Sequence, residues 1–571
     1  GGGCGGGGGR FAIYLITPTM PAGDGHTHNV IVLGGSYGGM HAAMVLAESL
    51  PPTHRVVLIE RNSHFNHLYV FPRFSIYPGH EHKAFVPYTS IFSDARPRRR
   101  VEARPPSFGA VPLHGRGLSD LSEMARSLDE KDPARGGTVV ACMDDVRHGR
   151  VVLDDQGGSG ARGDDDEAYA AAEPHVVLHA SVVNLTPTHV TVRDPYATKG
   201  RGLWSIDTVD IPYSYMIYAL GSRMPDPLRL ERFTKYEGVE MMRNMQQRIR
   251  ESRDIVVVGG GALGVQMASD IATLYAGQGK HITLIHSRAN LLPAFDHEVH
   301  VRALKFLRQL GVHVVLGQRL ALADGCPMGS AVKGAGAGTE EAFATGKLSE
   351  QFVGKPEQRR HHIRTTHGVE LDCDLLLLCT GQQPNSELMA HMSPESVDPS
   401  TRLIRVLRTL QVMVPHDASA VRRPFDALPP CRDCDCFQDQ KLYPVEKGEA
   451  SAPPDCFWRV YAIGDCVDAY GAINAGYQAW FMADVAAGNI VKDIKASSGR
   501  SAETTRFDTF EPRPNLLKLT VGSGKCVVQS APEETENGTR IPVTEQDDPE
   551  DMMVEAVWKN MARADTTDMH A

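Results

Sequence analysis

The stretch DIVVVGGGALGVQMASDIATL carries glycines at a spacing suited to binding a phosphorylated ligand. Gly259, Gly261 and Gly264 form the pattern G-x-G-x-x-G between an apolar run typical of a strand and a segment typical of a helix. Such glycines permit a tight turn, a close approach of backbone to pyrophosphate, and close packing of helix on strand. The helix N-terminus adds N–H groups and a partial positive charge. We predict a dinucleotide-binding site at this turn.

A second turn, IVLGGSYGGM, has the same pattern with one departure. Gly34 and Gly39 occupy the first and last glycine positions, but Ser36 stands in the middle position. Serine is small enough for the turn, and its hydroxyl could donate to a phosphate oxygen. The alternative is a turn that has lost its ligand. Glu60 favours binding, because it ends the next predicted strand, where a carboxylate can hold ribose hydroxyls. We predict that this turn binds the adenosine half of FAD.

The corresponding strand end of the Gly259 unit lacks a carboxylate. His286 stands there, followed by Ser287 and Arg288. Nothing in this triplet repels a 2′-phosphate, and Arg288 could pair with one. The alternative is a solvated surface arginine. The sequence therefore leaves NADH and NADPH both open.

A third group of residues follows the apolar run 460–463. Gly464 and Asp465 end this run, and a long helical pattern begins near residues 472–475. Alone, a Gly-Asp pair is only a turn. Beside two glycine turns it resembles the second flavin motif of flavoproteins with two dinucleotide-binding domains. This resemblance implies that Asp465 accepts a hydrogen bond from the ribityl chain and that the helix N-terminus faces the pyrimidine end of the flavin.

Together these motifs resemble the FAD-dependent pyridine nucleotide-disulfide oxidoreductases, and within them the apoptosis-inducing-factor-like and ferroptosis-suppressor-like group. The similarity covers residues 29 to about 92, 175–320, 361–390 and 459 to about 530. FNHLYVFPR, VVLHA, ALGS and CTGQQPN match further family segments. The motifs and the resemblance predict these cofactor-binding residues: Gly34, Gly35, Ser36, Tyr37, Gly38, Gly39, Glu60, Arg61, Arg73, Leu178, Ala219, Gly221, Asp465, Ala475, Gly259, Gly261, Gly264, Gln266, His286, Arg288 and Gly381.

Two further positions depart from the family pattern. Leu220 replaces the usual threonine of one strand-to-loop signature, which is tolerable where backbone contacts dominate. Gln266 stands where many relatives have a glutamate near the nicotinamide. The glutamine removes a negative charge close to the path of the hydride. The rate of hydride transfer and the preference for NADH or NADPH can therefore differ from those of relatives that have the glutamate.

The repetition of strand, glycine turn and helix predicts an α/β fold with two Rossmann-like dinucleotide-binding domains. We expect an FAD-binding domain at 29–228 and 384–510, interrupted by an NAD(P)H-binding domain at 229–383. A flexible segment at 1–28 precedes them, and a small C-terminal α+β region spans 511–571. Charge, proline and glycine predict insertions without a core at about 97–173, 324–360 and 415–456.

The overall composition argues against several classes of function and location. The net charge of −10 over 571 residues argues against non-specific nucleic-acid binding. No apolar run reaches the length of a membrane span. Eleven cysteines, several within apolar runs, suggest reduced thiols in a reducing compartment. We expect a cytoplasmic protein, with peripheral contact to a mitochondrial or lipid-droplet membrane left open.

The cysteines do not support electron relay through a dithiol. The predicted helix after Gly39 contains none, and Cys466 has no partner nearby in sequence. The spacing of Cys431, Cys434 and Cys436 in CRDCDC is unusual, but zinc would need a fourth ligand such as Cys456. The sequence assigns no metal ligand and no catalytic side chain.

The resemblance implies an FAD-dependent NAD(P)H oxidoreductase that passes electrons to a quinone-like small molecule. Two alternatives remain open: a type II NADH:quinone dehydrogenase, and an FAD-holding death-signalling or nucleotide-sensing protein with little turnover. Membrane-bound quinone dehydrogenases usually carry an amphipathic tail. The tail here places Met553, Val557 and Met561 on one helical face, and we expect it to dock on the flavin domain. The sequence does not indicate an oligomeric state.

Overall fold

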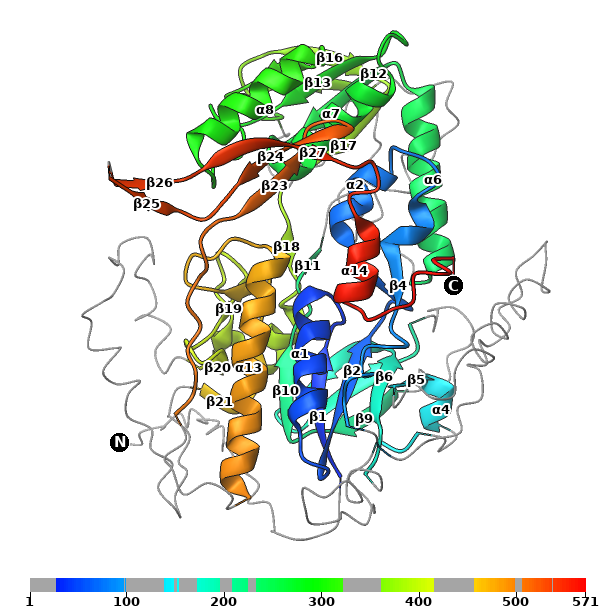
Figure 1. Ribbon diagram of the computed structural model, residues 1–571, viewed down its shortest axis with the longest axis vertical. Helices are drawn as coiled ribbons and strands as arrows, with labels where there is room; N and C mark the ends of the chain where they lie inside the picture. The colour runs from blue at the N-terminus through cyan, green and yellow to red at the C-terminus, as the bar shows by residue number, and fades with distance from the viewer. Residues whose placement is uncertain are drawn as a thin grey trace, which may run out of the picture.

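The computed structural model is a mixed α/β structure with two parallel sheets, one above the other in Figure 1. It describes residues 27–96, 98, 138–147, 151–153, 172–195, 208–223, 229, 233–321, 361–414, 456–498, 506–536 and 538–570. Residues 1–26 of the predicted flexible segment 1–28, the predicted insertion at 324–360, and residues 415–455 with the CRDCDC cysteines lie outside the described residues. His28, the last residue of the predicted flexible segment, instead begins β1.

The first sheet has seven strands among the described residues, and β20 alone of them is antiparallel. Its apolar runs, such as Val30–Leu33 and Val56–Ile59, are almost fully buried, as expected for a parallel sheet covered on both faces. In spatial order the strands are β20 (Gln411–Met413), β21 (Cys456–Ala462), β10 (Tyr215–Tyr218), β1 (His28–Leu33), β2 (His54–Glu60), β6 (His175–His179) and β5 (Thr138–Cys142).

Two helices lie side by side against this sheet in Figure 1: α1 (Tyr37–Ser49) and α13 (Gly476–Ser497). Their small residues allow close packing, since a Cβ on Gly38 would lie 3.0 Å from that of Ala479. A separate antiparallel sheet consists of β7 (Ser181–Leu185), β8 (His189–Arg193) and β9 (Thr208–Pro212).

The structure differs from the sequence prediction at residues 138–147. This segment lies in the predicted insertion at about 97–173, yet β5 pairs with β6 and α4 (Met143–Arg147) follows it. Val139 and Ala141 are buried. A short apolar run can thus extend a sheet edge even between segments of low-complexity composition.

The second sheet has the order β14-β13-β12-β17 and is parallel throughout. Thr234 and Glu237 form a capping box that starts α6. The elements are α6 (Lys235–Glu251), β12 (Asp254–Val258), α7 (Ala262–Leu274), β13 (His281–Ile285), α8 (His297–Gln309), β14 (His313–Val315), the hairpin β15 (His361–Arg364) and β16 (Glu370–Cys373), and β17 (Leu375–Leu378).

A set of short elements lies outside the two large sheets. They are β3 (His64–Asn66), η1 (Leu68–Val70), α2 (Phe71–Phe74), η2 (Glu81–Ala84), β4 (Phe85–Pro87), β11 (Ser222–Arg223), β18 (Gln383–Pro384), α11 (Glu387–Met392), η3 (Pro394–Ser396), β19 (Ile404–Arg405) and β22 (Val467–Asp468). Within the described residues, no helix combines the length and apolarity that crossing a bilayer requires.

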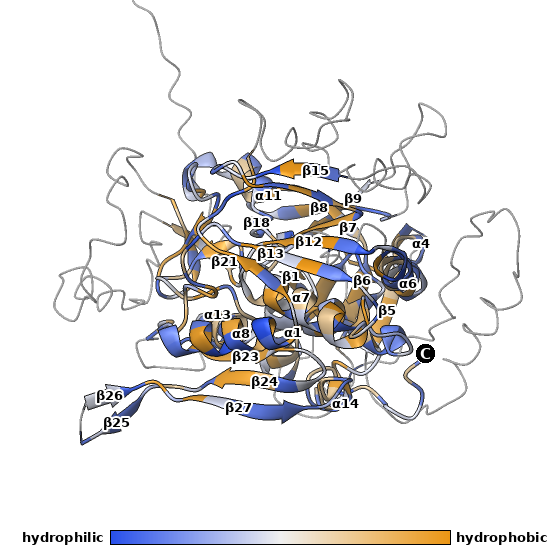
Figure 2. Ribbon diagram, turned by 90° about the horizontal axis from the view of Figure 1, so that it is seen from above, coloured by the Kyte–Doolittle hydropathy of each residue, from blue (hydrophilic) through white to orange (hydrophobic). Residues whose placement is uncertain are grey.

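The C-terminal region forms an antiparallel ribbon and one helix. Figure 2 shows the ribbon along one side of the molecule, with a hairpin projecting from it. Its strands are β23 (Leu517–Thr520), β24 (Gly524–Gln529), β25 (Glu533–Thr535), β26 (Gly538–Arg540) and β27 (Val543–Asp548), and the helix is α14 (Val554–Asn560).

Helix α14 packs against the segment that contains η2. Trp558 is fully buried, and its indole Nε1 donates to the carbonyl oxygen of Lys83 at 2.9 Å. The buried side of the tail consists of Val554, Trp558 and Ala562, whereas Met553 is exposed. The tail docks as expected, but not chiefly through the face that the sequence suggested.

Candidate functional site

Both glycine turns are tight at their first and last glycines. Gly34 and Gly259 have positive φ angles of 94° and 121°, which side chains disfavour. A Cβ on Gly39 would lie 1.9 Å from the carbonyl oxygen of Gly34, and one on Gly264 would lie 1.8 Å from that of Gly259. Each turn therefore brings a helix directly onto a strand end, and only glycine fits at these positions.

The middle position of each turn is different. Ser36 and Gly261 have almost the same extended backbone, with φ of −82° and −80°. A Cβ on Gly261 would meet no described atom within 4 Å. The departure at Ser36 is therefore compatible with the turn, because this position has room for a side chain.

Three helix N-termini point to bound anionic or polar groups. The N-cap residues of α1, α7 and α13 are Ser36, Gly261 and Ala475. None of these residues makes a side-chain capping hydrogen bond, and none of the three first turns contains an acidic residue. In α13 the first N–H donates to the hydroxyl of Tyr69, which comes from another segment. In contrast, α6 and α8 have side-chain caps and a glutamate in the first turn. Uncapped N–H groups bind phosphate and carbonyl oxygens well, so these three helix ends suit the phosphates and pyrimidine ring of the predicted cofactors.

The residues at the two strand ends hold the second glycine of each turn. The Gly35 N–H donates to Glu60 Oε2 at 2.5 Å, and Glu60 Oε1 accepts from the Asn62 N–H at 2.8 Å. In the other unit, the Gly260 N–H donates to His286 Nδ1 at 3.0 Å. Glu60 and His286 therefore occupy equivalent places.

Asp465 joins two loops that are far apart in the sequence. Its Oδ2 accepts from the Ser222 hydroxyl at 3.0 Å. This contact forms because β10 and β21 are neighbours in the sheet and the carboxyl ends of parallel strands lie along one edge. Burial raises the pKa of Asp465, and the hydrogen bond from Ser222 partly opposes the shift. The position fits the predicted ribityl contact.

An aromatic group beside α13 was not among the predicted residues, apart from Tyr37. The Tyr37 hydroxyl lies 2.7 Å from His67 Nδ1, and the Tyr69 hydroxyl accepts the Gly476 N–H, the first of α13, at 2.8 Å. Tyr69 is 49% exposed, although Tyr37 and His67 are buried. Burial lowers the pKa of His67 to about 4, so this imidazole is neutral at pH 7. His67 and Tyr69 both lie in the segment FNHLYVFPR, which matches a family segment. Their contacts with Tyr37 and Gly476 join residues that are distant in the sequence, so the sequence alone does not show them.

Arg73 departs from its predicted place. It is fully buried, its Nε donates to Asp270 Oδ2 at 2.7 Å, and its Nη2 donates to the carbonyl oxygen of Gly522 at 3.2 Å. These partners come from α7 and the loop after β23, so the guanidinium does not line an open site. The family resemblance implied an FAD contact for Arg73, and a guanidinium fully buried against these partners does not fit that role.

The other predicted residues lie at or near the strand ends. Leu178 and Ala219 are buried at the ends of β6 and β10, whereas Arg61, Arg288 and Gly381 are exposed. Gln266 is 8% exposed, and its Nε2 lies 3.8 Å from Met552 Sδ. The C-terminal segment therefore lies against the first turns of α7.

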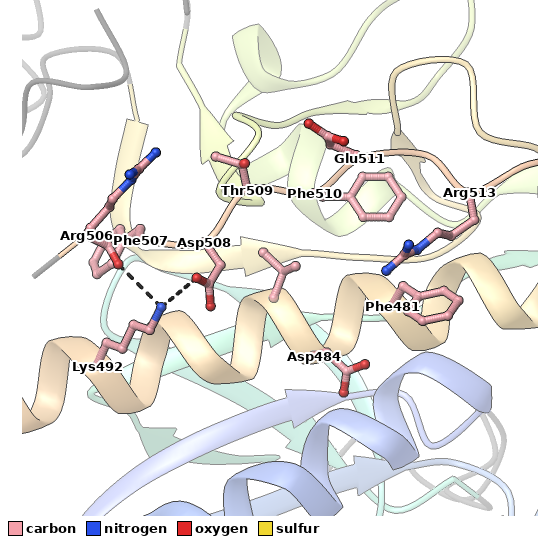
Figure 3. A pocket seen from close by; sticks show the side chains of 11 residues that line it. Phe481, Asp484, Lys492, Arg506, Phe507, Asp508, Thr509, Phe510, Glu511 and Arg513 are labelled. Atoms are coloured by element: carbon pink, nitrogen blue, oxygen red, sulfur yellow. Dashed lines mark hydrogen bonds and ion pairs between the residues drawn. The ribbon is translucent and has the colours of Figure 1, made fainter.

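The groove shown in Figure 3 lies elsewhere, between the middle of α13 and residues 506–513. Two of its cationic side chains have partners within the groove: Lys492 Nζ lies 2.7 Å from Asp508 Oδ1, and the Arg513 guanidinium lies 4.4 Å from the centre of the Phe481 ring. No described group of three or more His, Cys, Asp or Glu side chains is arranged to hold a metal ion.

Sequence comparison identifies the family to which this geometry belongs. The family profile described as pyridine nucleotide-disulphide oxidoreductase matches residues 28–416, more than half of the 571 residues. The chain belongs to this family. Its members are oxidoreductases that use FAD and NAD(P)H, so the predicted membership of a flavoprotein family is confirmed.

Relatives within the family agree with the predicted group. Fe-regulated protein 8 of Mycosarcoma maydis is 29% identical over 512 residues, which cover 88% of each chain. Ferroptosis suppressor protein 1 of Homo sapiens is 27% identical over 292 residues, covering 50% of this chain and 58% of that protein. Apoptosis-inducing factor homolog B of Dictyostelium discoideum is 25% identical over 188 residues, covering 32% and 44%.

One similar solved structure is the water-forming NADH oxidase from Lactobacillus brevis bound to NADH. It covers 88% of this chain and 75% of that chain, with a TM-score of 0.45 and 13% identity.

Proposed function

We propose that the chain is an FAD-dependent NAD(P)H:acceptor oxidoreductase that needs no redox-active disulfide. It takes a hydride from NAD(P)H and passes the electrons to a small quinone-like acceptor. The observation that carries this proposal is the pair of equivalent glycine turns, each leading into a helix without a side-chain cap. We assign the Ser36 turn to an FAD domain at 29–228 and 384–510, and the Gly261 turn to an NAD(P)H domain at 229–383.

The chain contributes binding, orientation and shielding. The N–H groups of α1 would hold the pyrophosphate of FAD, Glu60 the ribose, Asp465 the ribityl chain, and the N-terminus of α13 the pyrimidine ring. When bound, FAD supplies the two-electron acceptor that amino-acid side chains lack. Holding the two coenzymes in a fixed geometry removes much of the entropic barrier to transfer between them. No side chain has to act as nucleophile or general base.

The environment of Cys466 supports direct transfer rather than relay through a dithiol. Its Sγ is fully buried and lies 3.4 Å from the carbonyl oxygen of Ile463. Burial raises the pKa of this thiol to about 12. A reactive cysteine needs an accessible thiolate, so Cys466 does not fit that role.

The half-exposed ring of Tyr69 supports a flat acceptor. It lies beside the first residue of α13, with the Tyr37 ring centre 5.2 Å away. Aromatic rings stack well on planar apolar molecules, and quinones have this character. A cytoplasmic location and contact with a membrane surface stay predictions.

The test begins with the absorption spectrum of the purified protein. We expect the band of oxidised flavin near about 450 nm, its bleaching by NAD(P)H without oxygen, and its return on adding a soluble quinone. Asp465→Ala should reduce the FAD content severely, whereas Asp484→Ala, on the outer part of α13, should not. Absence of flavin, or full flavin content in Asp465→Ala, would contradict the proposal. Bound flavin without turnover would instead support the nucleotide-sensing alternative.

A further inference from the structure

The two turns of this chain form an internal comparison. Each closes through a hydrogen bond from its second glycine N–H to the residue that ends the following strand. In the first turn that acceptor is the Glu60 carboxylate, and in the second it is His286 Nδ1. A Cβ on Gly260 would lie 2.6 Å from His286 Cγ, so the imidazole lies directly against the turn. The second turn therefore closes with the same hydrogen-bond geometry as the first, but without the negative charge of a carboxylate.

The hydrogen bond fixes the form of the histidine. Because Nδ1 accepts a hydrogen bond from the Gly260 N–H, the imidazole carries its own proton on Nε2. His286 is 9% exposed and its Nε2 has no hydrogen-bond partner. Burial lowers the pKa of His286, the nearby Asn290 backbone opposes the shift, and Arg288 and His300 lower the pKa further. The imidazole is therefore neutral at pH 7.

The surroundings of this strand end are basic. Residues 286–290 contain no aspartate or glutamate. Arg288 and His300 both lower the pKa of His286. Burial lowers the pKa of His300 itself, so Arg288 supplies the positive charge at this place. Arg288 is exposed, and its carbonyl oxygen accepts the Gly317 N–H at 3.0 Å, which anchors its backbone beside β14. Its side chain is available to an anion next to the turn.

We propose that the second turn selects a dinucleotide whose adenosine ribose is phosphorylated, so that NADPH is the preferred electron donor. His286 is the specificity-determining residue, since it closes the turn without a carboxylate that would repel the 2′-phosphate. Arg288 supplies the positive charge that pairs with this phosphate. The first turn, with Glu60, keeps the unphosphorylated ribose of FAD. This inference rests on the proposed function and names the nucleotide used at that site.

Two substitutions separate charge from turn closure. His286→Glu gives the second turn the acceptor of the first, so it retains an acceptor for Gly260 and adds a negative charge. His286→Gln is the matched control, because its amide oxygen can accept the same N–H without a charge. We expect His286→Glu to weaken NADP⁺ binding at least about tenfold, which corresponds to about 1.4 kcal/mol, with little change for NAD⁺. His286→Gln should keep the preference of the unaltered protein.

The measurement is the Kd of NADP⁺ and of NAD⁺ for the flavin-loaded protein, determined by titration at fixed ionic strength. Arg288→Ala should weaken NADP⁺ and leave NAD⁺ nearly unchanged. Equal affinities in the unaltered protein, or the same NADP⁺/NAD⁺ ratio in His286→Glu, would overturn the inference. Neither of these results would contradict the proposed oxidoreductase function. That function is contradicted instead if neither NADH nor NADPH bleaches the flavin.

Discussion

At the scale of residues, each turn separates the glycines that pack against backbone from a middle position that opens outward. The first and last glycines touch backbone carbonyls that cannot move away, whereas the middle position opens outward. Ser36 and Gly261 share one backbone conformation. The fold therefore requires glycine at the first and last positions of the pattern, but not at the middle position.

This separation predicts that one of two glycine substitutions lowers the stability of the fold strongly and that the other hardly changes it. Gly264→Ala should destabilise the fold by about 1–3 kcal/mol or more, as expected for overpacking, because its Cβ would lie 1.8 Å from the carbonyl oxygen of Gly259. Gly261→Ser copies the first turn and should change stability by no more than about 0.5 kcal/mol. Urea unfolding measures both effects. Similar losses in the two variants would show that the middle position also packs.

Residues fixed by local spacing were predictable, and those fixed by distant contacts were not. The glycines, Glu60 and His286 follow from the geometry of strand, turn and helix, which spans few residues. The partners of Tyr69 and Arg73 are Gly476 and Asp270, which lie 407 and 197 residues away along the chain. No local pattern carries that information, and the family resemblance implied an FAD contact for Arg73 rather than this ion pair.

At the scale of elements, the helices differ in how their N-termini are completed. The N-cap side chains of α6 and α8 accept hydrogen bonds from their own helices, whereas the N-cap residues of α1, α7 and α13 make no side-chain capping hydrogen bond. Strand and helix patterns were sufficient to predict the elements around both turns. They were insufficient for β5, because a short edge strand is recognisable only by the neighbour with which it pairs.

The docking of the C-terminal segment should depend on pH. The His82 ring stacks on that of His570 with centres 3.7 Å apart, and Lys235 Nζ donates to the carbonyl oxygen of Met569 at 2.8 Å. The pKa of His82 is lowered to about 4, chiefly by burial and in smaller part by His570, Lys235 and Lys83, against an opposing effect of Glu81. The ordinary value is about 6.5. The released state therefore binds more protons between these values, and docking weakens as pH falls from about 6.5 towards 4.

Hydrogen exchange of residues 554–570, corrected for the intrinsic effect of pH, measures this docking. We expect lower protection at pH 5 than at pH 7.5. His82→Phe is the control, since it retains a stacking ring that cannot be charged, and its protection should depend less on pH. An identical pH profile in both proteins would assign the effect to other groups.

At the scale of the whole molecule, one buried ion pair joins parts that are distant in the sequence. Arg73 lies in α2, between the two large sheets, and Asp270 lies in α7 beside the second sheet. The carbonyl oxygen of Gly522 brings the C-terminal ribbon to the same guanidinium. Both side chains of the pair are fully buried. The relative placement of the two turns therefore depends in part on this junction.

A double-mutant cycle tests the junction. Arg73→Met leaves the Asp270 carboxylate buried without its partner. Asp270→Leu leaves the Arg73 guanidinium buried without its partner. Each single change should cost about 3–5 kcal/mol, because an uncompensated charge remains in the interior. The double variant should cost clearly less than the sum, since it removes both charges and keeps apolar volume. Urea unfolding of the flavin-loaded protein gives the coupling free energy. Additive losses would show that the two charges are stabilised independently and that other contacts align the sheets.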